Sequence, residues 1–155
     1  IIDYYLAKGN ILELGLKNKC VLVTGASQGI GAAIAKGFLN EGAKVSIVSR
    51  GSKNLYKTES DLVIKYGKEN VKADKCDCTS LSSLENLKDK IQIRWKSLDV
   101  LVANVGSGNS VSSPLPSLDQ WNKTWNNNFE SALSTVRTFL PMLKASKGCI
   151  LFISS

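Results

Sequence analysis

The sequence predicts one α/β domain built on a doubly wound parallel sheet. Four short apolar runs and a weaker strand segment at 71–77 alternate with segments in which apolar residues recur at helical spacing. Strands that alternate with helices form βαβ units, whose parallel strands are covered by helices on both faces. A glycine-rich segment joins the first apolar run to the first helical segment, which is typical of such domains. The chain has 155 residues, 43% of them hydrophobic, and is long enough to bury a core.

The elements follow one another without an internal repeat or a linker, so we expect one domain over residues 19–155. Residues 1–18 show no clear period and are expected to form an N-terminal extension. The chain opens at Ile1 and stops at Ser155 directly after an apolar run, so we expect the domain to be truncated after its fifth strand. The expected strands are 20–23, 45–48, 71–77, 98–103 and 150–153. The expected helices are 29–41, 53–66, 80–95 (or 82–95) and 117–144.

Each expected helix carries an apolar stripe. In the first, Ile30, Ile34 and Phe38 lie three or four positions apart, and Gly42 is a plausible stop. The other stripes are Leu55, Leu62, Val63 and Tyr66; Leu84, Leu87, Ile91 and Trp95; and Trp121, Trp125, Ala132, Val136, Phe139 and Leu140. A loop rich in Gly, Ser and Pro over 106–117 precedes the last helix, and loops of that length are often functional.

Composition excludes several chemistries. The chain has no His, which removes Ser-His-Asp and Cys-His nucleophiles, imidazole bases and His-bound zinc. No apolar run approaches the ~18 residues of a membrane span. Four cysteines without a paired CxxC framework favour reduced structural thiols, no metal, and a protein of the cytoplasm or another reducing intracellular compartment. The net charge of +7 leaves nucleic-acid binding open, but the lysines are scattered, which favours a solvated surface and no nucleic acid.

The glycine-rich loop, residues 24–31, reads Thr-Gly-Ala-Ser-Gln-Gly-Ile-Gly. Glycines permit positive φ and let backbone N–H groups approach a diphosphate at a helix N-terminus, where the helix dipole favours anions. A tight turn with close helix packing is the plain structural alternative. The spacing is T-G-x-x-x-G-x-G, which differs from the usual G-x-G-x-x-G pattern.

That variant and three later motifs resemble the short-chain dehydrogenase/reductase family, over about residues 16–155. The later motifs are Asp77-Cys78-Thr79 after the third strand, Ala103-Asn104-Val105-Gly106 after the fourth, Asn128 in the last helix, and the final Ser154-Ser155. The second motif departs from the family's N-N-A-G by Ala103 and Val105.

The resemblance implies a Rossmann-like fold, an oxidoreductase activity and a set of site residues. It implies cofactor contacts by Gly25, Ser27, Gln28, Gly29, Ile30, Gly31, Asp77, Cys78, Asn104, Val105 and Gly106. In relatives the Asp77 segment contacts the adenine, and the Asn128 position holds a helix bend and a water of the proton relay. Ser155 matches the serine that is catalytic in the family. The implied reaction interconverts a small-molecule carbonyl and an alcohol by hydride transfer.

The end of the second strand predicts the cofactor. An acidic residue there would accept the ribose hydroxyls of NAD, but the chain has Ser49 and Arg50. A hydroxyl and a guanidinium suit the 2′-phosphate of NADP, and Lys53 adds a charge nearby. We therefore expect NADP(H), with NAD(H) possible and a solvated Arg50 as the plain alternative.

The family's Tyr-x-x-x-Lys acid/base segment does not follow the serine. A Tyr-x-x-x-Lys does occur at Tyr4 and Lys8, but it precedes the first strand, so we interpret it as chance. The alternative to an enzyme is a non-catalytic nucleotide-binding fragment or pseudo-enzyme. Trp121 and Trp125 lie either in the domain core or in a homo-oligomer interface through the 117–144 helix, as in relatives.

Overall fold

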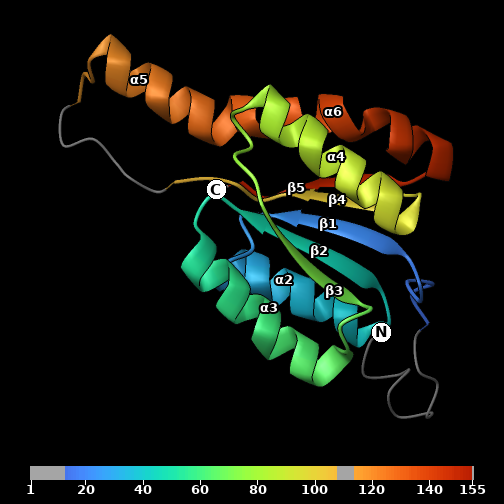
Figure 1. Cartoon of the computed structure of the whole chain (residues 1–155). Coiled ribbons are helices and arrows are strands. Elements are labelled where there is room, and N and C mark those ends of the chain that lie inside the picture. Colours follow the sequence, from blue (N-terminus) through green and yellow to red (C-terminus); the bar gives the residue numbers. More distant parts are fainter. Residues whose placement is uncertain (1–12, 108–113, 155) are drawn as a thin grey trace, which may run out of the picture.

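A computed structural model describes residues 13–107 and 114–154. The described chain forms one sheet of five parallel strands in the order β3-β2-β1-β4-β5 (Figure 1). The strands are β1 (Cys20–Thr24), β2 (Lys44–Ser49), β3 (Val71–Lys75), β4 (Val100–Ala103) and β5 (Cys149–Phe152). The doubly wound, Rossmann-like fold is confirmed, although the third and fourth strands are shorter than expected and β5 begins and ends one residue earlier.

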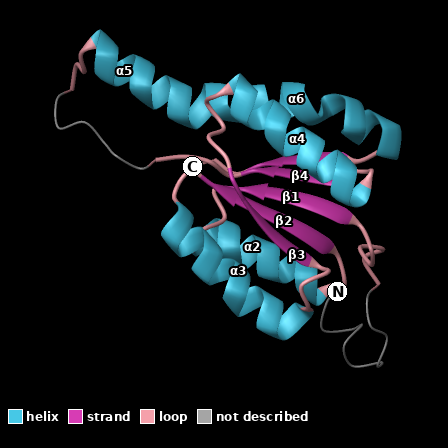
Figure 2. Ribbon diagram, viewed as in Figure 1, coloured by secondary structure: helices cyan, strands magenta, loops and turns pink. Residues whose placement is uncertain are grey.

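The helices lie in two layers, one on each face of the sheet (Figure 2). Their bounds are α2 (Gly29–Asn40), α3 (Ser52–Tyr66), α4 (Leu81–Trp95), α5 (Leu118–Trp125), the π-helical turn η1 (Asn126–Glu130) and α6 (Ser131–Ser146). Helices α2 and α3 cover one face, and α4 with α6 covers the other. No helix in the described ranges is long and apolar enough to cross a membrane.

Strand β1 shows why a central strand can be an almost unbroken apolar run. Successive side chains of a strand point to opposite faces, so Val21 and Val23 pack against α2 and α3 while Leu22 packs beneath α4 and α6. All three are fully buried. Because both faces of this central strand are covered by helices, its sequence does not alternate between apolar and polar residues.

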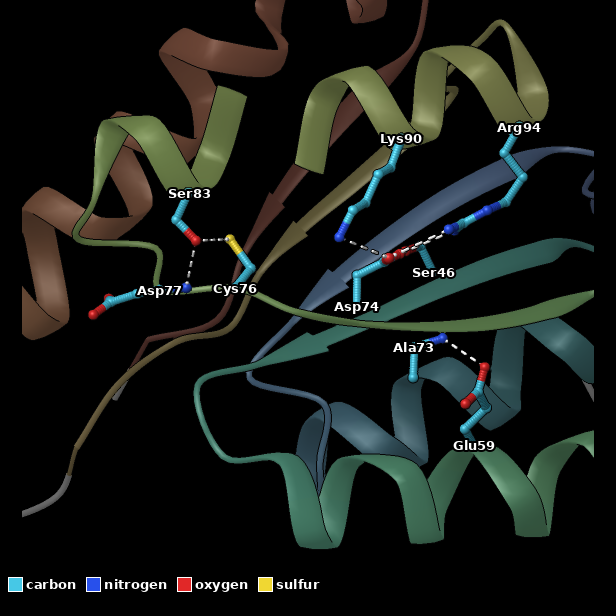
Figure 3. A network of polar contacts seen from close by, with 9 residues as sticks. All are labelled: Ser46, Glu59, Ala73, Asp74, Cys76, Asp77, Ser83, Lys90 and Arg94. Atoms are coloured by element: carbon cyan, nitrogen blue, oxygen red, sulfur yellow. Dashed lines mark hydrogen bonds and ion pairs between the residues drawn. The ribbon is translucent and has the colours of Figure 1, made fainter. Parts of the chain in front are cut away.

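The two edge strands, β3 and β5, differ in how far they are covered by the rest of the chain. At the β3 edge, the Glu59 side chain of α3 accepts a hydrogen bond from the backbone N–H of Ala73 at 2.9 Å (Figure 3). At the other edge, Leu151 and Phe152 of β5 are 43% and 59% exposed. The expected burial of this strand on both faces is therefore wrong for the described chain, because β5 is the outermost strand there.

The last helical segment is longer than the expected 117–144 helix and is not uniform. It begins at a capping box, in which Ser117 Oγ accepts from the Gln120 N–H and the Gln120 side chain accepts from the Ser117 N–H. It then runs through η1 into α6, so that residues 118–146 form one helix with a π-turn near its middle. Phe139 of α6 is fully buried, whereas no residue of α5 is.

Candidate nucleotide-binding site

The motifs that are far apart in the sequence meet at the carboxyl ends of the strands. Strand β1 has β2 on one side and β4 on the other, so the chain crosses to the opposite side of β1 between β3 and β4. The carboxyl ends of β1 and β4 are therefore the topological switch point, where doubly wound sheets bind ligands. A cavity of about 470 Å³ opens there, and we call it the β2-side cavity. Its lining residues are Gly25, Ser27, Gln28, Ser49, Arg50, Gly51, Cys76, Asp77, Cys78, Thr79, Asn104, Val105, Gly106 and Asn127.

A second cavity of about 490 Å³ adjoins the first, and we call it the β5-side cavity. It is lined by Ile30, Asn104, Val105, Gly106, Ser107, Asn128, Ile153 and Ser154. Because Asn104, Val105 and Gly106 line both cavities, the two adjoin each other at the end of β4, and we call them together the strand-end depression.

Most of the expected site residues line these cavities. Gly29 and Gly31 line neither, and Ile30 and Asn128 belong to the β5-side cavity alone. Ser155 lies outside the described residues. Sequence reasoning missed Asn127, whose only signal was its place beside Asn128 in a run of three asparagines.

Backbone geometry makes three glycines of the glycine-rich loop necessary. Gly25 and Gly29 have φ of +64° and +59°, a region that side chains disfavour. Gly31 is buried, and a Cβ added there would lie 2.5 Å from the Gly25 carbonyl oxygen and 2.6 Å from Nδ2 of Asn104. The first turn of α2 therefore packs against the loop only because residue 31 has no side chain.

Asn104 ties the glycine-rich loop to the end of β4. Its Nδ2 donates to the carbonyl oxygens of Thr24 and Gly25, at 3.1 and 3.3 Å. Its backbone N–H donates to Thr24 Oγ1 at 2.9 Å, and that hydroxyl donates to the Val102 carbonyl. Thr24 and Gly25 are thus held by the Asn104 side chain and backbone, which fixes the glycine-rich loop against the segment after β4 that lines both cavities.

Asp77 begins the loop after β3 with its carboxylate already engaged. Its Oδ1 accepts from the Thr79 N–H at 2.9 Å and from the Thr79 hydroxyl at 2.7 Å. The Thr79 N–H lowers the pKa of Asp77 most, burial opposes it, and the Thr79 hydroxyl and the charge of Arg50 lower the pKa further, so that the net shift is downward. The carboxylate is therefore ionised at neutral pH beside the β2-side cavity.

The two thiols flanking Asp77 are buried beneath α4 and α6. Ser83 Oγ donates to Cys76 Sγ at 3.5 Å and accepts from the Asp77 N–H at 3.0 Å (Figure 3). Hydrogen bonding from Cys78, and then from Ser83, lowers the pKa of Cys76 to about 7. The hydrogen bond to Cys76 and burial both raise the pKa of the Cys78 thiol. Within the described ranges, no group of three or more Cys, Asp or Glu residues could hold a metal ion.

Arg50 lines the β2-side cavity. Its side chain is exposed, and the residue also lines a small neighbouring cavity with Lys75 and Asp77. The Ser49 hydroxyl is hydrogen-bonded to the Gly51 backbone, accepting from its N–H and donating to its carbonyl at 3.2 Å each. Ser49 therefore shapes the turn that presents Arg50.

The π-turn η1 brings Asn128 to the loop after β4. Asn128 Oδ1 accepts from the Ser107 N–H at 2.7 Å, and its Nδ2 donates to the Thr124 carbonyl at 3.0 Å. The second bond supplies a side-chain partner inside a widened turn, where the ordinary helical ladder is interrupted. The helix irregularity and the β4 loop are thus coupled through one amide.

Trp121 and Trp125 do not lie in the domain core, so that alternative is wrong. They are 56% and 45% exposed, and Phe129 is 49% exposed. The rings of Trp125 and Phe129 lie 4.5 Å apart between centroids. With Leu118, which is 80% exposed, these residues form an apolar stripe along α5 and η1.

The fold and this depression define a doubly wound, Rossmann-like α/β domain with its candidate site at the topological switch point. The model of the short chain dehydrogenase family matches residues 19–155, and the chain belongs to that family.

Relatives cover the chain almost fully, but the chain spans about half of their length. It is 32% identical over 148 residues to a dehydrogenase/reductase SDR family protein 7-like of Dictyostelium discoideum, covering 92% of this chain and 47% of that protein. It is 36% identical to a very-long-chain 3-oxoacyl-CoA reductase of Anas platyrhynchos over 141 residues, covering 86% and 44%.

Solved structures agree with this assignment. L-sorbose reductase of Gluconobacter frateurii, complexed with NADPH and L-sorbose, has a TM-score of 0.84 at 27% identity, covering 91% of this chain and 54% of that one. An alcohol dehydrogenase of Thermococcus sibiricus, complexed with 5-hydroxy-NADP, has a TM-score of 0.80 at 29% identity, covering 86% and 57%.

Proposed function

We propose that this chain is the cofactor-binding part of an NADP(H)-dependent oxidoreductase that interconverts a carbonyl and an alcohol by hydride transfer. The observation that carries the proposal is the pair of adjoining cavities at the switch point, which are lined by residues of the glycine-rich loop, by Asn104 and by Arg50. When bound, the nicotinamide supplies or accepts the hydride.

The residues fit such a dinucleotide. The packing of Gly31 against Gly25 and Asn104 brings the N-terminus of α2 against the loop, and backbone N–H groups at a helix N-terminus bind phosphate oxygens. In this assignment the adenine half lies along Asp77 and Cys78. The nicotinamide half lies in the β5-side cavity, where Ile30 offers an apolar surface.

Arg50 supports NADP(H) over NAD(H). A guanidinium can bind a 2′-phosphate through two charge-assisted hydrogen bonds, and residues 49–53 contain no carboxylate to accept ribose hydroxyls. Several structural relatives were solved with NADP-type cofactors, including a Pseudomonas aeruginosa RhlG/NADP complex that is 30% identical to this chain. Lys53 adds positive charge in the first turn of α3.

The proposed chemistry needs a proton donor, which in the family belongs to the Tyr-x-x-x-Lys segment. Ser155 would stabilise the substrate oxygen. Asn128 would position the water of the proton relay, because its amide already links η1 to the loop that borders the β5-side cavity. The Tyr and Lys of the family's acid/base segment would come from sequence beyond Ser155. A non-catalytic nucleotide-binding protein is the second candidate, and the partial coverage of the relatives keeps it in view.

The test is a comparison of this chain with the longest product of its gene. We expect the longer product to carry Tyr-x-x-x-Lys and to reduce carbonyl compounds with NADPH, and Ser155→Ala should reduce turnover at least a hundredfold. The 155-residue chain alone should show no turnover. Turnover by the short chain would contradict the acid/base assignment, and a longer product without the Tyr and Lys would favour the non-catalytic alternative.

We also propose that the stripe of Leu118, Trp121, Trp125 and Phe129 is an interface between copies of this protein. Four large apolar side chains on one exposed helix face are unusual for a surface in contact with water alone.

The four cysteines are free thiols, which supports a reducing compartment such as the cytoplasm.

A further inference from the structure

Helix α3 contacts the glycine-rich loop at two consecutive residues. Thr58 Oγ1 donates a hydrogen bond to the carbonyl oxygen of Ser27 at 2.7 Å. One turn earlier, Asn54 Nδ2 donates to Oε1 of Gln28 at 3.0 Å. Residues four apart lie on the same face of a helix, so both contacts come from the side of α3 that faces the loop.

The bond from Thr58 fixes the orientation of a peptide plane. The described chain has no cis peptide bonds, so the carbonyl of Ser27 and the N–H of Gln28 point in opposite directions across their shared plane. Because the carbonyl is held toward α3, the N–H of Gln28 is turned away from α3. Ser27 and Gln28 both line the β2-side cavity, and Gln28 is the N-cap of α2.

Thr58 itself lines neither cavity. It is half-buried between α3 and the loop, so its bond to Ser27 is partly shielded from water and retains more of its strength than an exposed bond. Its hydroxyl therefore acts on a ligand in the depression only indirectly, and its contact with the glycine-rich loop is the Ser27 carbonyl.

The same helix begins beside Arg50. Gly51 is its N-cap, and the Ser49 hydroxyl holds the Gly51 backbone. Helix α3 thus joins the two parts of the site that would meet phosphate groups: the glycine-rich loop at Thr58 and the turn carrying Arg50 at its N-terminus.

We propose that Thr58 is a positioning residue that holds the glycine-rich loop in its anion-binding conformation, so that affinity for nicotinamide dinucleotides depends on its hydroxyl. The inference rests on the proposed cofactor site. Since the diphosphate is common to NADPH and NADH, loss of the hydroxyl must weaken both by the same factor. This distinguishes Thr58 from Arg50, whose proposed partner is present in NADPH alone.

The experiment measures the Kd of NADPH and of NADH by calorimetry, and the melting temperature, for this chain and three variants. Thr58→Val keeps the shape of the side chain and removes the donor, and Thr58→Ser keeps the donor. Ser60→Ala is the matched control, because Ser60 lies on the same helix and its hydroxyl bonds the Tyr56 carbonyl of that helix. We expect Thr58→Val to raise both Kd values by about three- to tenfold, and the other two variants to change them by less than about twofold.

Two results would overturn the inference while leaving the proposed function intact. One is a lower melting temperature for Thr58→Val with both Kd values unchanged, which is what a purely structural hydroxyl would give. The other is a loss confined to NADPH. If the unsubstituted chain binds neither nucleotide, the proposed function fails and the inference fails with it. Should the β-branched valine prevent folding, Thr58→Ala removes the same donor with a better helix former and must give the same equal losses.

Discussion

Arg94 of α4 makes a two-pronged contact with the buried carboxylate of Asp74 on β3. Its Nη1 and Nη2 lie 3.0 and 3.3 Å from the two carboxylate oxygens (Figure 3). Lys90 lies 3.8 Å from the same carboxylate, and Ser46 of β2 donates to it at 3.4 Å. This network joins β3 to α4, the two elements that flank the Asp77–Thr79 segment of the candidate site.

Asp74→Asn should therefore lower the free energy of unfolding. The substitution removes the negative charge opposite a half-buried guanidinium, and breaking one side of a buried pair costs about 3 kcal/mol. Chemical denaturation measures the loss. Glu85→Gln is the control, because the Glu85–Lys88 pair is more exposed and should contribute less than about 1 kcal/mol. Equal effects of the two substitutions would show that the buried network adds nothing.

Gly31→Ala should destabilise the chain and weaken nucleotide binding together. The added Cβ would overlap the Gly25 carbonyl oxygen and the Asn104 amide, and such overpacking costs about 1–3 kcal/mol. Gly37→Ala on the same helix is the control, since a Cβ there meets nothing within 4 Å. It should stabilise the chain by about 0.5–1 kcal/mol, as Ala does in an exposed helix. A Gly31→Ala variant as stable as the parent would contradict the close packing.

The ionisation of Asp77 should depend on the Thr79 side chain. Because the folded-state pKa of Asp77 is lowered, its carboxylate stabilises the folded chain above the unfolded-state pKa, and this contribution is lost as the pH falls through the folded-state value. Thr79→Val removes the hydroxyl donor and keeps the backbone N–H donor. NMR titration of the Asp77 carboxyl should show its pKa rising part of the way to the ordinary value, and Thr79→Ser should restore it. A pKa that does not move would exclude the hydroxyl as a cause.

The apolar stripe on α5 and η1 should mediate self-association. Trp121→Glu places a charge in the middle of the proposed interface, so sedimentation velocity should show a smaller assembly than the parent chain. Ile93→Glu provides the comparison, because Ile93 is 82% exposed on α4 and lies outside the stripe. If both variants sediment like the parent chain, residues 118–129 are not the interface.

The sequence was most informative where local pattern decides structure. Apolar runs predicted four of the five described strands, the alternation with helices placed the weaker third strand, and helical periodicity predicted both helical layers. Motifs placed after strands had to meet at one edge of a parallel sheet. Contacts between distant residues leave no periodic signal, so neither the Asp74–Arg94 pair nor the Thr58–Ser27 bond was predicted. The π-turn had only a weak sign in Asn126, Asn127 and Asn128, which are poor helix formers. Exposure of Trp121 depends on what packs over it, which residue spacing does not specify.

In the proposed function, the depression at the strand ends binds NADP(H), with Arg50 on the 2′-phosphate. Calorimetric titration of this chain and of its Arg50→Ala variant with NADPH and NADH tests it most directly. We predict that the chain binds NADPH more tightly than NADH, and that Arg50→Ala weakens NADPH about tenfold or more while changing NADH less than about twofold. Equal losses of affinity for the two nucleotides, or no binding of either by the unsubstituted chain, would contradict this assignment of the site.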